Sequence, residues 1–245
     1  AVADHGYPLI APAPGHVEQD ANEWIRGAFA TLAEVCASGS FEPSQVAGIG
    51  VDGQSWSCVP VAADGAVLAN TPIWMDVRAQ SICDEVLTRV PAREIFAVGG
   101  NRFSPSYSTA KALWFQRERP EVFSRARWFL QCNSVIVQAL TGVASQDHSQ
   151  GYGWHFIDVA TGRVDRDLAA RIGVDPDRIP EAVEPSAVVG GLTASAANAI
   201  GLRAGIPVVA GGLDAACGTL GAGAFLPGQT QEQGGQAGGM SIAMD

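Results

Sequence analysis

The stretch Val208–Gly223 constrains the fold more than any other part of the chain. An apolar, partly β-branched run leads through Gly211 and Gly212 into a series of small residues that suits a helix. Asp214 lies at the junction. Because a carboxylate in the first helical turn faces free backbone N–H groups and the positive end of the helix dipole, we expect Asp214 to be ionised at neutral pH. The same residues also fit an ordinary helix N-cap.

The overall composition is that of a globular protein with an acidic surface. The chain has 245 residues, of which 47% are hydrophobic and 16% charged, enough for one large domain or two small ones. Its formal net charge of −10 argues against a nucleic-acid or anionic-membrane surface, because both partners need a basic footprint. We therefore expect neither nucleic acid nor membrane as a partner, and a homodimer is compatible with the sequence.

The cysteines and histidines show no metal-ligand spacing. No CxxC pair occurs among the five cysteines, and His148 and His155 have no third ligand nearby in sequence. Irregularly spaced cysteines favour a reduced, intracellular protein. The first residues lack a basic segment followed by an apolar run, so we expect a cytoplasmic protein without a secretory signal. The missing initiator methionine suggests that the chain begins inside a longer polypeptide.

The first third of the chain predicts a helix followed by short strands. Asp20, with Glu23 three residues later, resembles a capping box, and apolar residues then recur at helical spacing. The pattern next predicts a buried strand over Val46–Val51 and a second strand over Ser57–Val61. A turn at Asp64 follows the second strand and indicates a hairpin or meander.

Farther along, helical segments alternate with loops. Ile73–Arg78 reads as an apolar strand that ends in Asp76 and Arg78, which either line a site or form an ordinary ion pair. The segments predicted to be helical are 79–88, 109–120, 121–140 with a break near Cys132, and 194–201. Residues 145–154 are polar and contain glycine, so they are predicted to form a loop.

Three common catalytic motifs fit the sequence poorly. Gly53–Ser57 approaches the serine-hydrolase elbow G-x-S-x-G, but Ser57 replaces the second glycine and a predicted strand follows where a helix is needed. Lys111, the one lysine in the sequence, has no glycine-rich loop before it, which argues against a P-loop. The absence of G-x-G-x-x-G argues against a nicotinamide dehydrogenase.

The remaining candidates suggest a sugar site. They share a place at predicted strand ends or in the loops that follow, and they are Gln54, Trp56, Trp74, Asp76, Arg78 and Asp214. Indole faces cover the apolar C–H surface of a sugar, whereas amide, carboxylate and guanidinium groups bind its hydroxyls. An ionised aspartate can also accept a hydroxyl proton. The alternative is that the tryptophans are ordinary core residues.

The chain resembles the first lobe of the FGGY family of carbohydrate kinases, nearest to pentulose kinases such as the xylulokinases. The similarity rests on ordered motifs: PGHVEQD at 14–20, IGVDGQSW at 49–56, PIWMDVRA at 72–79, STAKALWF at 108–115, ALTG at 139–142 and GLRAGIPVVAGGLDAACGTLGAG at 201–223. The resemblance implies an RNase H-like α/β lobe of the actin and hexokinase type, with a mixed central sheet flanked by helices.

The resemblance also implies an activity. It is transfer of the γ-phosphoryl group of ATP, with Mg²⁺, to a hydroxyl of a ketose, in particular a pentulose such as xylulose. Asp214 matches the catalytic base, and the positions that match sugar-binding motifs are Gln54, Ser55, Trp56, Trp74, Asp76 and Arg78. A positioned carboxylate suits phosphoryl transfer, because the attacking hydroxyl must lose its proton.

The sequence departs from the family pattern in three respects. The family's opening phosphate hairpin and most of its second lobe are not in the sequence, so residues 1–224 are expected to form the sugar-binding lobe and 225–245 the start of a nucleotide-binding lobe. Trp56 and Ser57 replace a His-Gly pair of the sugar turn. Gly235, Gln236 and Ala237 stand where a Gly-Thr-Ser nucleotide-phosphate motif is expected. A catalytically silent sugar-binding or regulatory relative is the alternative.

Overall fold

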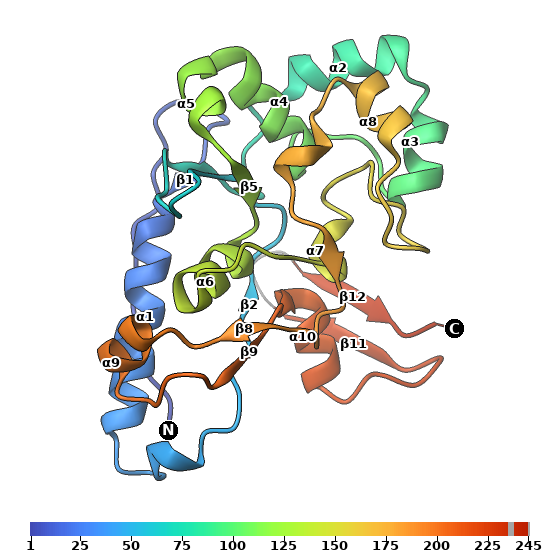
Figure 1. Ribbon diagram of the computed structural model, residues 1–245. Helices are drawn as coiled ribbons and strands as arrows, with labels where there is room; N and C mark the ends of the chain where they lie inside the picture. Colours follow the sequence, from blue (N-terminus) through green and yellow to red (C-terminus); the bar gives the residue numbers. More distant parts are fainter. Residues whose placement is uncertain (235–237, 245) are drawn as a thin grey trace.

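The computed structural model describes residues 1–234 and 238–244 as short paired strands surrounded by helices (Figure 1). The elements of the first half are β1 (Glu18–Gln19), α1 (Ala21–Ala37), β2 (Asp52–Gly53), β3 (Val59–Val61), β4 (Thr71–Pro72), α2 (Gln80–Arg89), α3 (Ala92–Gly99), α4 (Ser108–Glu118), α5 (Pro120–Arg125), β5 (Trp128–Leu130) and α6 (Cys132–Thr141). Those of the second half are β6 (Gln146–Asp147), α7 (His148–Gly151), α8 (Arg166–Ile172), β7 (Ala182–Val183), β8 (Val188–Gly191), α9 (Ala194–Ile200), β9 (Pro207–Val209), β10 (Gly212–Leu213), α10 (Asp214–Gly221), β11 (Thr230–Gln233) and β12 (Gly239–Ile242).

Parallel and antiparallel strand pairs occur together, each as a two-stranded ladder. Strand β2 pairs with β10 and β6 with β7 in parallel, whereas β3 pairs with β5 and β8 with β9 antiparallel. The chain before β2 runs alongside β9, because Ile49 N–H donates to Pro207 O at 2.9 Å and Val209 N–H donates to Ile49 O at 3.0 Å. This pairing continues into β2 and β10 and so positions the residues that follow both strands.

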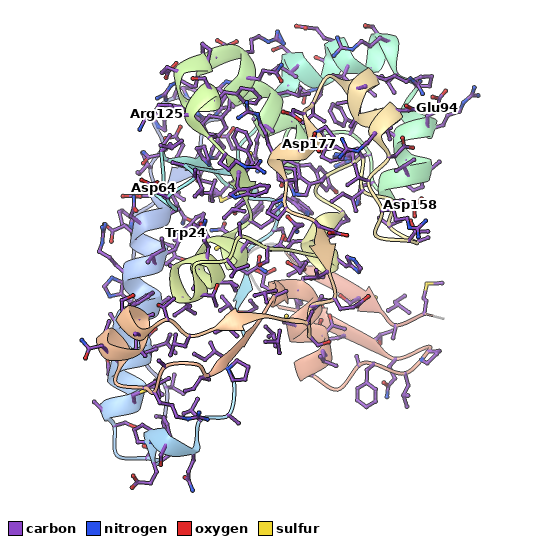
Figure 2. All side chains as sticks on the ribbon, in the orientation of Figure 1. Trp24, Asp64, Glu94, Arg125, Asp158 and Asp177 are labelled. Carbon is purple, nitrogen blue, oxygen red and sulfur yellow. The ribbon has the colours of Figure 1, made fainter. Side chains whose placement is uncertain are left out.

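Two apolar clusters hold the helices against the strands. The first includes buried side chains of α2, α4, α5 and α8, and the second those of α1, α6, α9 and β9. Trp24 of α1, which is 3% exposed, belongs to the second cluster and lies between α1 and α6 (Figure 2). Charged side chains such as Glu94 and Asp158 project at the outer edge of the molecule (Figure 2).

The helices with strong local signals form as predicted. Asp20 caps α1 by accepting from Asn22 N–H, although Glu23 pairs with Arg26 and is not part of a reciprocal capping box. Thr193 caps α9 in the same way, through Ala196 N–H at 3.2 Å. At the other end of a helix, Gly142 ends α6 with a positive φ of 77°.

Four local predictions are wrong. The predicted helix 121–140 contains strand β5, because its apolar run Trp128–Leu130 pairs with β3. The predicted strand over Val46–Val51 is confined to a bridge at Ile49, and β2 begins only at Asp52. The predicted strand 73–78 is turn, because the paired residues lie earlier, in β4. The predicted loop 145–154 contains β6 and α7, both held by tertiary contacts.

Across residues 1–234 and 238–244, the structure contains no helix with both the length and the apolar character needed to cross a bilayer.

Candidate active site

The parallel pairing of β2 with β10 brings the turn at 54–56 next to Asp214. In this register Asp52 lies opposite Gly212 and Gly53 lies opposite Leu213, so the two chains leave the pair in the same direction. Two glycines permit the close approach. A Cβ at Gly211, whose φ is +75°, would lie 1.9 Å from Val51 O, and one at Gly53 would lie 2.7 Å from Asn133 N.

Asp214 is the first residue of α10 and is accessible to solvent. Its Oδ1 accepts from Ala215 N–H at 2.7 Å, an interaction that lowers the pKa. Partial desolvation and the nearby charge of Asp52 outweigh this bond, so the pKa of Asp214 lies above its ordinary value. The direction is opposite to that expected from the helix dipole alone, and it suits a group that accepts a proton.

Asp52 is a second carboxylate near Asp214, and it was not among the candidate residues predicted from the sequence. It is exposed in β2, opposite Gly212 of β10, and its charge raises the pKa of both Asp214 and Cys217. The available signal was the lone acid in IGVDGQ, which follows a predicted strand just as Asp214 does. Asp52 in β2 and Asp214 at the start of α10 therefore lie close enough for their charges to interact.

The turn at 54–56 is held by amide and aromatic side chains. Gln54 Nε2 donates to Gln19 Oε1 at 2.7 Å, and Trp24 Nε1 donates to the same oxygen at 3.1 Å. Trp56 stacks on Tyr107 with ring centroids 4.2 Å apart. Ser55, between them, is partly buried.

Gln150, in the region predicted to be loop, holds this turn through side-chain hydrogen bonds to its backbone. Its Nε2 donates to Gly53 O and to Gln54 O, both at 3.0 Å, and its Oε1 accepts from Trp56 N–H at 3.4 Å. The side chain is fully buried. Nothing local in the sequence marks Gln150, because its partners lie 94 to 97 positions away.

The nearby Asp147 links the same region to the residues directly before Asp214. Its carboxylate accepts from Ser149 Oγ at 2.5 Å and from Asn133 Nδ2 at 2.9 Å. Ser149 Oγ in turn accepts from Leu213 N–H at 2.9 Å, directly before Asp214, and Asn133 Nδ2 also donates to Ala210 O at 3.1 Å. Burial raises the pKa of Asp147 despite these hydrogen bonds.

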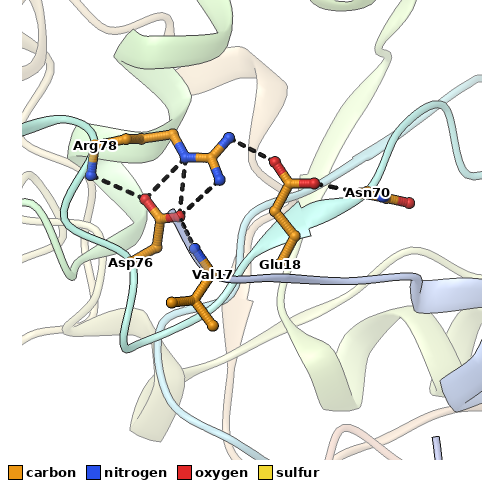
Figure 3. Close-up of polar contacts among 5 residues, drawn as sticks. All are labelled: Val17, Glu18, Asn70, Asp76 and Arg78. Atoms are coloured by element: carbon orange, nitrogen blue, oxygen red, sulfur yellow. Dashed lines mark hydrogen bonds and ion pairs between the residues drawn. The ribbon is translucent and has the colours of Figure 1, made fainter. Parts of the chain in front are cut away.

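Asp76 and Arg78 form a buried ion pair that extends to β1 (Figure 3). Arg78 Nε and Nη2 donate to the Asp76 carboxylate at 2.7 to 2.9 Å, and Nη1 donates to Glu18 Oε1 at 2.6 Å. Asp76 also accepts from Val17 N–H at 2.6 Å. The guanidinium carbon lies 4.7 Å from the Trp114 ring centroid. Direct contact of these two side chains with a sugar stays a prediction.

Lys111 connects this ion pair with the turn. Its side chain is fully buried in α4, and Nζ donates to Trp56 O at 2.7 Å. Burial lowers the pKa of Lys111 to about 7, while the nearby Cys58 and Asp76 act in the opposite direction. In the sequence, Lys111 suggested only a P-loop lysine, whereas in the structure it contacts a carbonyl 55 positions away.

A cavity of about 270 Å³ adjoins the turn. Its lining includes Asp52, Gly53 and Gln54 of the β2 region together with Tyr7 and Trp24. Among the predicted sugar-binding residues the cavity therefore reaches Gln54, whereas Trp74 is partly buried against the second apolar cluster.

Two further predictions concern cofactors. Gly235, Gln236 and Ala237, predicted to bind nucleotide, lie outside the residues that the structure describes. In the described ranges 1–234 and 238–244, no group of three or more His, Cys, Asp or Glu side chains is arranged to hold a metal ion. The nucleotide-binding and Mg²⁺ predictions therefore stay predictions.

Comparison with known proteins gives a consistent result. Residues 1–221 match the N-terminal domain of the FGGY family of carbohydrate kinases. The chain is 30% identical over 224 residues to the xylulose kinase of Bacillus subtilis (strain 168), covering 91% of this chain and 45% of that protein. It is 31% identical over 213 residues to the xylulose kinase of Escherichia coli (strain K12), covering 86% and 43% respectively.

A solved structure agrees with these relatives. The crystal structure of xylulose kinase from Rhodospirillum rubrum superimposes with a TM-score of 0.89 at 31% identity, covering 94% of this chain and 47% of that one. The predicted α/β fold of the sugar-kinase type is thereby confirmed. The chain spans about half the length of the relatives that it matches.

Proposed function

The chain belongs to the FGGY family of carbohydrate kinases, and on this premise we propose that it supplies the sugar-binding lobe and the catalytic base of an ATP-dependent pentulose kinase. The observation that carries the proposal is the β2–β10 pair, which sets the turn at 54–56 beside Asp214. Xylulose is the proposed substrate, because similar proteins of two bacteria are xylulose kinases. Residues 1–224 form this lobe, and 225–245 begin a second lobe that holds the nucleotide.

In the proposed reaction, Asp214 accepts the proton of the sugar hydroxyl that attacks the γ-phosphorus of ATP. The bond from the γ-phosphorus to the bridging oxygen breaks as the new phosphorus–oxygen bond forms, leaving ADP and a sugar phosphate. The raised pKa of Asp214 favours proton acceptance. Free N–H groups at the start of α10 favour negative charge near the transferred group.

We propose that the sugar lies against the turn, where Gln54, Ser55 and Trp56 contact its hydroxyls and C–H faces. The indole of Trp56 is partly exposed and is positioned against Tyr107. Trp74, Asp76 and Arg78 belong to the same proposed surface through the family motif. Asp76 and Arg78 also contact Val17 and Glu18, which indicates that the ion pair supports the site structurally as well.

Mg²⁺ accompanies ATP in this proposal. Asp52, whose charge acts on Asp214, offers a carboxylate for Mg²⁺, which commonly keeps several waters and shares its other ligands with phosphate. The chemistry that Mg²⁺ supplies when bound is neutralisation of charge on the phosphate oxygens. The residues of this chain orient the sugar and remove its proton.

The first test measures ADP release by the two-lobed protein with ATP and Mg²⁺. The sugars are several ketopentoses, a ketohexose, an aldose, a polyol and glycerol. Turnover selective for a ketopentose supports the proposal. Sugar binding without turnover of any member would favour the catalytically silent relative.

The second test changes the proposed base. Asp214→Asn should lower kcat by at least about a hundredfold, because the attacking hydroxyl loses its proton acceptor. Asp167→Asn is the matched control, since Asp167 is also an exposed acid in a first helical turn, that of α8. Equal rates in the Asp214 variant and the control would refute the assignment of the base.

A further inference from the structure

The backbone of Trp56 has an unusual conformation. Its φ of 59° is the sole positive value at a non-glycine residue within 1–234 and 238–244. The left-handed region costs a residue with a side chain roughly 1–2 kcal/mol, so a bulky residue stays there only where its surroundings hold it. The turn that we propose to contact the sugar is therefore held in place by its neighbours.

The contacts that hold Trp56 act on both sides of the residue. Lys111 Nζ donates to its carbonyl oxygen at 2.7 Å, and Gln150 Oε1 accepts from its N–H at 3.4 Å. Both side chains are fully buried and come from different helices, α4 and α7. Gly153 leaves room for the ring, because a Cβ there would lie 3.2 Å from Trp56 Cδ1.

The indole N–H of Trp56 lies beside the hydroxyl of Tyr152. Trp56 Nε1 is buried and makes no hydrogen bond of ordinary geometry among the described residues. Tyr152 is nonetheless close enough for Trp56 to lower its pKa against the effect of burial, and the two rings meet edge to face with centroids 5.8 Å apart. A sugar hydroxyl that enters beside the ring would compete with Tyr152 for this donor.

We propose that Lys111 and Gln150 are positioning residues that fix the left-handed backbone of Trp56 and so orient its indole toward the sugar. The sugar part of this proposal rests on the proposed function of the turn at 54–56. Lys111 has no other hydrogen bond from Nζ in the described part of the chain, so the buried amine serves this one carbonyl. Replacing Lys111 thus leaves Trp56 O without its donor and releases the backbone.

The first experiment tests the positioning without any sugar. Near-ultraviolet circular dichroism of the two-lobed protein gives the signal of Trp56 as the difference between wild type and Trp56→Phe. The same difference is then measured with Lys111→Met in both proteins. We expect the Trp56 signal to fall by at least half in the Lys111→Met background, and an unchanged signal would overturn the positioning role.

The second experiment measures binding of xylulose by calorimetry in a double-mutant cycle. Lys111→Met should weaken binding about tenfold, as for a buried carbonyl left without its hydrogen-bond donor. Trp56→Gly adopts a positive φ freely, so adding Lys111→Met to Trp56→Gly should change the dissociation constant less than about twofold. Independent, additive losses would overturn the proposal, because they would mean that Lys111 acts without Trp56.

Controls separate positioning from loss of stability. Ile200→Ala removes a buried side chain of α9 in the second cluster and should destabilise the fold without weakening xylulose binding. If Lys111→Met does not fold, Gln150→Leu replaces it in both experiments with the same expectations. If wild type binds no pentulose, the proposed function fails, whereas the dichroism experiment still decides whether Lys111 fixes Trp56.

Discussion

Replacement of Arg78 by methionine should cost the fold a large part of its stability, because it leaves the Asp76 carboxylate buried without its cation. The Asp76 side chain is 0% exposed and that of Arg78 is 3% exposed. Removal of one partner of a buried ion pair costs roughly 3–5 kcal/mol. Two backbone donors remain at Asp76, Val17 N–H and Arg78 N–H, so we expect about 3 kcal/mol, the lower end of this range.

The assay is urea unfolding followed by far-ultraviolet circular dichroism, with xylulose binding measured on the folded protein. Arg119→Met is the matched control, because Arg119 pairs with Glu121 at the surface, where both side chains are well exposed. It should change the free energy of unfolding little. The double variant Asp76→Asn with Arg78→Met should recover part of the loss, because the buried side chain at position 76 then carries no unpaired charge.

Equal losses of stability in Arg78→Met and Arg119→Met would refute this reasoning. The binding measurement also decides between two roles for the ion pair. A folded Arg78 variant with an unchanged dissociation constant would mean that Arg78 supports the site structurally. A tenfold weaker affinity with little loss of stability would mean that it contacts the sugar.

Two further predictions concern pH. Asp52→Asn should lower the pKa of Asp214, because the charge of Asp52 helps to raise it. A carbon-13 NMR titration of the Asp214 carboxyl without Mg²⁺ checks this, and a titration moved to higher pH would contradict it. Burial lowers the pKa of His155 to about 4, so the folded state binds fewer protons than the unfolded state between pH 6.5 and 4. The free energy of unfolding should therefore fall by on the order of 3 kcal/mol as the pH is lowered through this window. Urea unfolding measured at successive pH values checks this, and His155→Gln should make the free energy of unfolding depend less on pH.

The sequence predicted the parts of the site that depend on neighbours along the chain. The strand, the two glycines and Asp214 are contiguous, and their order specifies a strand that turns directly into a helix. The same holds for the helix caps Asp20 and Thr193. Each accepts a hydrogen bond from a backbone N–H group two or three residues later. Local chemistry is sufficient in these cases.

The sequence did not predict the side chains that hold the site together. Gln150 lies in a polar stretch that reads as loop, yet it binds two carbonyl groups almost a hundred positions earlier. Lys111 is predicted only to lie on a helix, and its contact with Trp56 O forms because the fold brings the two residues together. Strand β5 likewise forms because β3 is available to pair with it. Each depends on a long-range contact that no local pattern reveals.

The β2–β10 pair also has a consequence for how the chain folds. Its partners Asp52 and Gly212 are about 160 positions apart, and a contact of such separation closes a long loop at a high entropic cost. The helices need only neighbours in sequence and form early, whereas non-local strand pairing is slow. During refolding the protein should therefore regain its helix content first and its ability to bind sugar last.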